Sequence, residues 1–168
     1  MPHFVRSAAP QVKGGYRAFR PFVRADFVRQ CAYCLMTETF AGGEENFELD
    51  HFRPKSRFPL LLNDFLNIYY ACHPCNFTKL DHWPPRELEA RGRGIVDLCS
   101  EEFETHFSVQ ATGEWVGKTD SGDYTIDLLR LNRQNLVYLR RWLAKVGFAP
   151  HETRVGEDEL RILAERLR

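Results

Sequence analysis

The amino-acid sequence predicts an α+β protein in which short strands and helices alternate around two pairs of cysteines. Three observations lead to this fold class. The β-favouring stretches NFELDHF (46–52) and IYYA (68–71) are short and lie between segments with helical spacing. Residues 127–146 have the leucine pattern of an amphipathic helix. The cysteines occur as two CxxC pairs, at 31–34 and 72–75.

The N-terminal half is expected to run through helix, strand, loop, strand and helix. The phenylalanines of YRAFRPFVRADFVRQ predict a helix, broken at Pro21, that leads into Cys31. Alternating apolar and acidic residues predict the strand NFELDHF, and two prolines predict a loop with a final helical turn in RPKSRFPLLLNDFLN. IYYA is a second short strand, and NFTKLDHW is a short helix that begins at Asn76.

The pattern changes after Gly94. HFSVQATGEWVGKTDSGDYTI predicts two or three short strands around Gly113 and the Ser121–Gly122 turn. DLLRLNRQNLVYLRRWLAKV predicts one helix with leucines on one face and arginines elsewhere. GEDELRILAERLR, at 156–168, predicts a last helix.

Composition and charge narrow the class of protein. The 168 residues are 43% hydrophobic and 13% aromatic, which suffices for one ordinary core. The chain has neither a membrane-length apolar run nor a secretory signal, so we expect a cytoplasmic protein that does not contact a membrane. The net charge is zero, but residues 1–30 carry six basic side chains against one acid. This asymmetry indicates either a basic binding face or ordinary solvated surface.

The cysteine pattern predicts a structural zinc site. Each CxxC pair presents two thiolates on a tight turn, and two such turns complete the tetrahedral set Cys31, Cys34, Cys72 and Cys75. An odd count of five cysteines and the absence of a secretion signal argue against a disulfide framework. Cys99 is left over and is expected to be a small buried hydrophobe.

The 37 residues between Cys34 and Cys72 exceed the spacing of a simple zinc ribbon, so a further unit is inserted there. Four motifs in and around this insert together resemble the HNH endonuclease family, in its zinc-containing branch. They are CAYC, ELDHFRPKS, the asparagine of LNIYYAC, and CHPCNFTK. The resemblance covers about residues 31–82 and implies a ββα-metal (His-Me finger) core there, with helical elaborations at both ends. From its length and organisation, the chain is expected to form one domain over 1–168, in which an α+β elaboration occupies about 94–168.

The resemblance also implies a role for each motif residue. Asp50 resembles the first ligand of a catalytic divalent metal, and His51 resembles the general base. Asn76 resembles the second metal ligand, at the start of the helix, where many members have histidine. Asn67 resembles the asparagine that braces the loop beside the base without touching the metal.

These residue types suit the hydrolysis of a phosphodiester. A Mg²⁺ or Mn²⁺ ion held by one carboxylate and one amide oxygen keeps positions open for water and phosphate. A histidine with a pKa near roughly 6.5 is neutral and basic at cellular pH, so His51 can activate a water molecule. Neighbours on a strand point to opposite faces, so Asp50 and His51 serve one phosphate only if the backbone bends after them.

Basic residues follow the expected base, where a nucleic-acid backbone would run. Arg53, Lys55 and Arg57 are candidate phosphate contacts. Lys79 is either a fourth phosphate contact or a solvated surface side chain. No segment predicts a helix that reads bases. We therefore expect a nucleic-acid substrate, DNA before RNA, with weak sequence specificity or with targeting by a protein partner.

Two further expectations concern the biological setting and the competing class. The motifs above, with IDLLRLNRQNLVYLRR, loosely resemble small HNH proteins of prokaryotic mobile elements and anti-phage defence systems, some of which act with a partner protein. The alternative is a catalytically inactive zinc module that binds nucleic acid or protein. The joint presence of Asp50, His51 and Asn76 favours the enzyme.

Overall fold

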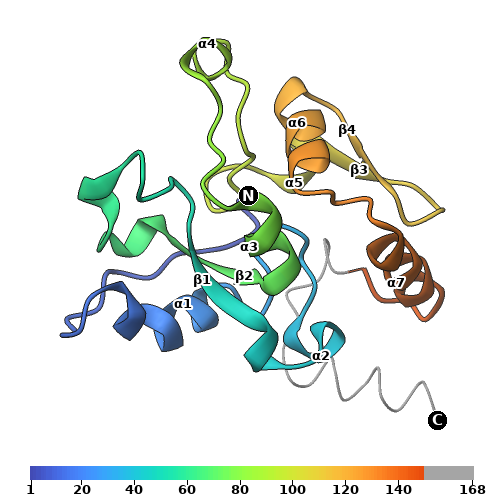
Figure 1. Ribbon diagram of the computed structural model, residues 1–168. Coiled ribbons are helices and arrows are strands. Elements are labelled where there is room, and N and C mark those ends of the chain that lie inside the picture. The colour runs from blue at the N-terminus through green and yellow to red at the C-terminus, as the bar shows by residue number, and fades with distance from the viewer. Residues whose placement is uncertain (150–168) are drawn as a thin grey trace.

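The computed structural model describes residues 1–149, and the helix expected over 156–168 lies outside them. Short helices surround two small antiparallel sheets, which confirms the α+β class (Figure 1). The helices and strands are η1 (Tyr16–Phe19), α1 (Arg20–Asp26), α2 (Glu38–Ala41), η2 (Glu44–Asn46), β1 (Phe47–His51), η3 (Pro59–Leu61), η4 (Phe65–Asn67), β2 (Ile68–Cys72), α3 (His73–Lys79), α4 (Arg86–Glu89), α5 (Phe103–His106), β3 (Phe107–Val109), β4 (Trp115–Gly117), α6 (Asp120–Leu128) and α7 (Gln134–Lys145). Within residues 1–149, no helix has the length and apolar character needed to cross a membrane.

The first sheet pairs β1 with β2, and α3 packs across it (Figure 1). The strands run antiparallel, with His51 opposite Ile68 and Phe47 opposite Cys72. β2 continues directly into α3. The helix begins at His73, earlier than the expected Asn76, because Pro74 suits the first helical turn, where backbone N–H groups have no intrahelical acceptor.

The core of this half lies against β2, which is buried along all five residues. The ring of Tyr70 stacks on Phe47 with centroids 4.7 Å apart, and the ring of Tyr69 lies 5.2 Å from Phe27. Aromatic pairs at these separations combine a large buried area with favourable ring geometry. They hold β1 against β2 and β2 against the C-terminal end of α1.

The helix α1 starts at Arg20, one residue before Pro21, and is not broken at the proline. The expected helix divides into η1 and α1, and Pro21 occupies the first turn of α1, where it can be accommodated. Val28 and Arg29 then have φ values of 51° and 57°, which end the helical segment and turn the chain toward Cys31. The expected break at proline is therefore a helix start.

The second sheet confirms the lower number, two, of the two or three strands expected after Gly94. β3 and β4 pair antiparallel, with Val109 opposite Trp115. The segment DSGDYTI is part of α6. The side chain of Thr119 caps this helix by accepting a hydrogen bond from the N–H of Gly122 at 3.1 Å. The cap and the acidic first turn outweigh the strand preference of the residues that follow.

The single helix expected over 127–146 is two helices. α6 ends at Leu128, α7 begins at Gln134, and Arg130 between them has φ 48°. Asn132 in this connection accepts a hydrogen bond from the N–H of Trp115 at 2.8 Å and donates one to its carbonyl at 2.7 Å. Pairing with β4 therefore interrupts a helix that the leucine spacing alone would have continued.

Candidate metal centre and catalytic cleft

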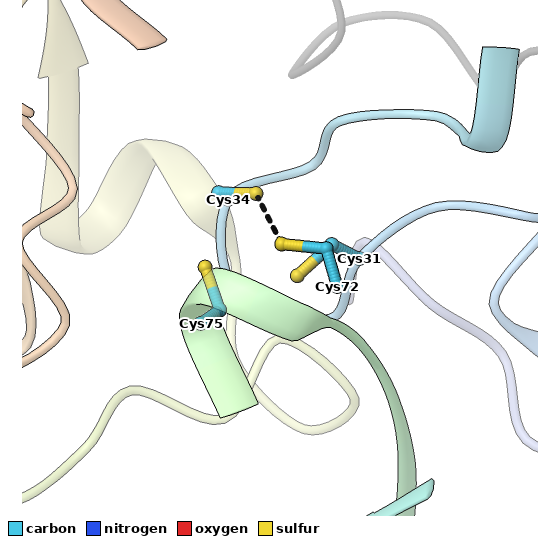
Figure 2. A group of neighbouring side chains, drawn as sticks. All are labelled: Cys31, Cys34, Cys72 and Cys75. Carbon is cyan, nitrogen blue, oxygen red and sulfur yellow. Dashed lines mark hydrogen bonds between the residues drawn. The ribbon is translucent and has the colours of Figure 1, made fainter. Parts of the chain in front are cut away.

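The four paired cysteines form one buried cluster. Their Sγ atoms all lie within 4.8 Å of one another, and those of Cys34 and Cys72 are 3.7 Å apart (Figure 2). A zinc ion with bonds of about 2.3 Å holds the sulfurs of a tetrahedron roughly 3.8 Å apart, so the cluster fits a structural zinc ion. Among residues 1–149, no other set of three or more His, Cys, Asp or Glu side chains comes together in this way.

Each CxxC pair is positioned by a different kind of turn. The first closes on itself, because Cys31 accepts a hydrogen bond from the N–H of Leu35 at 3.0 Å through its carbonyl. Ala32 then ties this turn to β2 by donating to the carbonyl of Tyr70 at 2.8 Å. In the second pair, Cys72 ends β2 and Cys75 lies in the first turn of α3.

Two arginines from the C-terminal half accompany the cluster. The terminal nitrogens of Arg133 lie 3.7 and 3.6 Å from Sγ of Cys75. Arg140 is buried, stacks on Trp115 with its guanidinium carbon 4.1 Å from the ring centre, and borders a cavity of about 30 Å³ beside Cys34. Burial lowers the pKa of Arg140 to about 10. Neither arginine has a carboxylate within ion-pair distance among the described residues.

The thiols share hydrogen bonds unequally. Hydrogen bonds from Cys31, Cys72 and Cys75 hold the pKa of Cys34 well below its usual range, whereas the bonds to Cys31 and Cys34 raise the pKa of Cys72 and Cys75. Four thiolates around a divalent zinc ion carry a net charge of about −2. The two guanidinium groups supply the opposite charge from outside the cluster.

A second site lies at the end of β1, where Asp50 and His51 border a cleft of about 200 Å³. The cleft is lined by Tyr16, Leu49, Asp50, His51, Pro54, Lys55, Asn76, Leu80 and Asp81. It therefore brings together both expected metal ligands, the expected base and one of the expected phosphate contacts. Arg53, Arg57, Asn67 and Lys79 are not among its lining residues.

The carboxylate of Asp50 is held from the interior by two side chains. Tyr33 donates its hydroxyl hydrogen to Oδ2, and Nζ of Lys79 lies 3.0 Å from Oδ2 and 3.3 Å from Oδ1. Burial raises the pKa of Asp50, although Lys79 and Tyr33 act to lower it. Both partners are hydrogen-bond donors, so they favour the ionised carboxylate.

Lys79 does not take the surface position that a phosphate contact requires. Its side chain is 0% exposed, and its ammonium group also donates to the carbonyl of His51 at 2.7 Å. The sequence contains the signal for this burial. Lys79 follows Cys75 by four residues, so both lie on the same face of α3, and Cys75 is in the buried cluster.

His51 is fixed on the other side of β1. Its Nε2 lies 3.0 Å from the carbonyl oxygen of Leu62, and its ring meets Tyr16 edge to face at 4.7 Å. A carbonyl oxygen only accepts, so this bond places the proton on Nε2 and leaves the Nδ1 lone pair unprotonated.

Asn76 has an acidic neighbour that the sequence reasoning missed. The amide nitrogen of Asn76 donates to Oε2 of Glu48, and Nδ1 of His73 lies 2.8 Å from Oε1 of the same carboxylate. Burial opposes ionisation, but the hydrogen bonds from His73 and Asn76 lower the pKa of Glu48. The position could have been found, because Glu48 precedes Asp50 by two residues and shares its face of the strand.

Asn67 bridges the loop that follows His51. Its Oδ1 accepts from the N–H of Arg53 at 2.9 Å, and its Nδ2 donates to the carbonyls of Arg53 and Leu61 at 3.1 and 3.3 Å. These bonds join the end of β1 to the loop before β2. They turn the backbone away from the strand directly after the Asp50–His51 pair.

Arg53, Lys55 and Arg57 are all exposed, but they differ in their contacts. Lys55 lies at the rim of the cleft, whereas Arg53 lies over the rings of Phe58 and Trp83, each 5.7 Å away. Arg57 donates to the carbonyl of Trp83 at 3.0 Å. In the basic N-terminal segment, three arginines are engaged within the protein: Arg6 with Asp26, Arg20 with Glu44, and Arg24 with Glu38.

Comparison with known proteins gives one distant similarity. No protein-family model matches the chain. The Septu protein PtuA of Bacillus mycoides (strain KBAB4) is 24% identical over 143 residues, an alignment that covers 71% of this chain and 20% of the relative. The chain therefore spans about a fifth of the length of that relative.

Proposed function

We propose that this chain is a metal-dependent HNH endonuclease that hydrolyses phosphodiester bonds of nucleic acid, with DNA as the first substrate to test. The observation that carries the proposal is the convergence of Asp50, His51, Asn76 and Lys55 on one cleft. In this proposal residues 31–82 form the nuclease core of a single domain over 1–168, and residues from about 94 onward elaborate it. In this proposal the four-cysteine cluster holds structural zinc; its sulfurs all lie within 4.8 Å of one another, and those of Cys34 and Cys72 are 3.7 Å apart, close to the spacing in a tetrahedral zinc site.

Each residue of the cleft has a distinct role in the proposed hydrolysis. Asp50 and Asn76 offer oxygen ligands to a Mg²⁺ or Mn²⁺ ion, which when bound supplies Lewis-acid stabilisation of the developing charge. Glu48 takes the amide hydrogens of Asn76, which leaves the amide oxygen available to the ion. Asn67 braces the loop beside the base through its bonds to Arg53.

His51 is the general base in this proposal. The bond from Nε2 to the carbonyl of Leu62 selects the tautomer in which Nδ1 accepts a proton from water. The proton taken from the attacking water resides on Nδ1, and the resulting imidazolium keeps its bond to Leu62. Lys55 at the rim is placed to contact a phosphate of the bound strand.

The setting that we propose is anti-phage defence, in association with a protein partner that supplies targeting. Two observations support it: the looser resemblance of the motifs to defence-associated HNH proteins, and the distant similarity to a Septu protein. The absence of a predicted base-reading helix is compatible with targeting from outside the chain.

A second candidate is a zinc-stabilised module that binds nucleic acid without cutting it. The observation that favours it is the ion pair between Lys79 and Asp50, because a carboxylate satisfied by an ammonium group is complete without a metal ion. Only the first candidate cleaves nucleic acid, so a cleavage assay distinguishes the two.

The test is a nicking assay on supercoiled plasmid with Mg²⁺, Mn²⁺ or EDTA, run in parallel on single-stranded DNA and RNA. We expect metal-dependent cleavage that falls about 10²–10⁴-fold in His51→Ala, the usual contribution of a general base. His82→Ala is the matched control, since this exposed histidine does not line the cleft. Both variants are checked for zinc content and folding. Binding of nucleic acid without cleavage under any of these conditions would select the second candidate.

A further inference from the structure

The carboxylate of Asp50 accepts hydrogen bonds from two side chains, one within or near each CxxC pair. Tyr33 is the third residue of CAYC, between Cys31 and Cys34, and Lys79 lies one helical turn after Cys75. Both partners of Asp50 are thus carried by the turns that build the four-cysteine cluster.

The contacts are unequal at the two carboxylate oxygens. Oδ2 accepts the hydroxyl hydrogen of Tyr33 and lies 3.0 Å from Nζ of Lys79, whereas within residues 1–149 the side-chain contact of Oδ1 is the longer one to Lys79, at 3.3 Å. A carboxylate offers about four lone-pair sites, so Oδ1 keeps acceptor capacity that Oδ2 has largely used. Asp50 and Asn76 both border the cleft.

Neither partner is free to move elsewhere. Lys79 is 0% exposed and Tyr33 is 3% exposed, and burial of an ammonium group is tolerated only where it is paired and hydrogen-bonded. Lys79 meets this condition through Asp50 and the carbonyl of His51. The ring of Tyr33 stacks beside that of Tyr69 with centroids 6.4 Å apart, which restricts its orientation.

We propose that Tyr33 and Lys79 are positioning residues that anchor Oδ2 of Asp50 and leave Oδ1 to ligate the catalytic metal ion. This inference rests on the proposed function, because it assigns Asp50 as a metal ligand. It adds that the four-cysteine cluster acts on the catalytic centre: zinc orders the turn at 31–34, the turn orders Tyr33, and Tyr33 orders the ligand. Mutation of a residue that hydrogen-bonds to a metal ligand typically lowers the metal affinity about 10–100-fold.

The test compares two tyrosine variants that each lose one buried hydroxyl group. Tyr33→Phe removes the bond to Asp50, whereas Tyr69→Phe removes a bond to Asp97 at 2.6 Å and leaves Asp50 untouched. Mn²⁺ binding to the zinc-loaded proteins is measured by the electron paramagnetic resonance signal of the free ion, without nucleic acid. The Mn²⁺ concentration that gives half-maximal nicking is measured beside it.

We expect Tyr33→Phe to weaken Mn²⁺ binding by about 10-fold or more and to raise the half-maximal concentration equally, with zinc content unchanged. Tyr69→Phe should bind Mn²⁺ as the unaltered protein does. If Tyr33 had only a structural role, each variant would lose some stability, but the two would bind Mn²⁺ equally well.

Asp50→Ala separates failure of this inference from failure of the proposed function. If Asp50→Ala abolishes Mn²⁺ binding while Tyr33→Phe binds normally, Asp50 is a ligand that needs no anchor, and only the positioning role is overturned. If the unaltered protein does not bind Mn²⁺, or Asp50→Ala binds it normally, the ligand assignment is wrong and the inference falls with it.

Discussion

Arg133 directs both terminal nitrogens of its guanidinium group at one sulfur atom, 3.7 and 3.6 Å from Sγ of Cys75. It precedes α7, so the C-terminal half of the molecule contributes directly to the surroundings of the cysteine cluster. Burial acts to lower the pKa of Arg133, but the sulfur atoms of Cys75, Cys34 and Cys72 outweigh it and raise that pKa above its usual range. Donors to thiolate sulfur stabilise its negative charge and so the metal that it binds.

Arg133→Gln should therefore weaken zinc retention. The variant keeps a polar side chain but loses the charge that faces the cluster, and we expect zinc to transfer to a chelating dye about 10-fold faster or more. Arg141→Gln removes the same charge from an exposed position on α7 and should release zinc at the original rate. Equal release from the two variants would show that Arg133 does not stabilise the zinc-loaded cluster.

Lys55→Ala should weaken nucleic-acid binding uniformly across sequences. An exposed lysine that contacts a phosphate contributes about one unit to the slope of log affinity against log salt concentration. The slope is measured by fluorescence anisotropy on two unrelated duplexes, with Lys145→Ala as control, because Lys145 is an exposed lysine of α7 outside the cleft. An unchanged slope would remove Lys55 from the binding surface.

Sequence reasoning reached those features that depend on neighbours along the chain. The alternation of Phe47 and Leu49 with acidic residues predicted β1, and the CxxC spacing predicted the cluster. The errors arose where a distant partner decides the outcome. Asn132 leaves the helical pattern because it pairs with the backbone of Trp115, and that bond is not encoded in the leucine spacing.

At Asp50, too, the sequence predicts the local structure but not the distant partners. Its place at the end of a strand was predictable from period-two alternation, but its two donors come from residues 17 positions before and 29 positions after it. Tyr33 and Lys79 reach it only because the cysteine turns bring both segments together. A single sequence gives the residue types of such a site, and the fold decides which of them meet.

Acid should reduce the stability contributed by Glu38. Burial acts to raise the pKa of this carboxyl, but hydrogen bonds from Arg24, at 2.6 Å, and Tyr70, at 2.5 Å, outweigh it and lower the pKa from 4.5. A depressed folded-state pKa means that the contribution is complete above about pH 4.5 and is lost as the pH falls through the lower folded value.

The measurement is urea unfolding of the unaltered protein and Glu38→Gln at several pH values between about 7 and 3.5. The difference in free energy of unfolding should shrink as the solution becomes more acid. Glu45→Gln alters an exposed carboxylate and should show no such trend. A difference between the unaltered protein and Glu38→Gln that is constant with pH would contradict the assignment.

Gly113→Ala should destabilise the protein more than Gly92→Ala. Both glycines have positive φ, +90° and +71°, so both substitutions carry backbone strain. A Cβ at 113 would also lie 2.4 Å from the carbonyl oxygen of Val137 in α7, whereas a Cβ at 92 meets nothing within 4 Å. We expect an additional cost of about 1–3 kcal/mol for Gly113→Ala, measured by urea unfolding. Equal losses of stability in the two variants would mean that the β3–β4 hairpin can move away from α7 to accommodate the added Cβ at no cost in free energy.

The two CxxC turns meet at one point, so the 37 residues between them form a ring that the cysteine cluster closes. The entropic cost of closing this ring depends only weakly on the number of residues in it, since doubling the loop costs about 0.6 kcal/mol. The arc around Leu60, which is 97% exposed, begins directly after the cleft. Insertions or deletions there would alter what lies beside the cleft while leaving the paired strands and the sulfur cluster intact. The side chains at the rim of the cleft can therefore change through loop length alone.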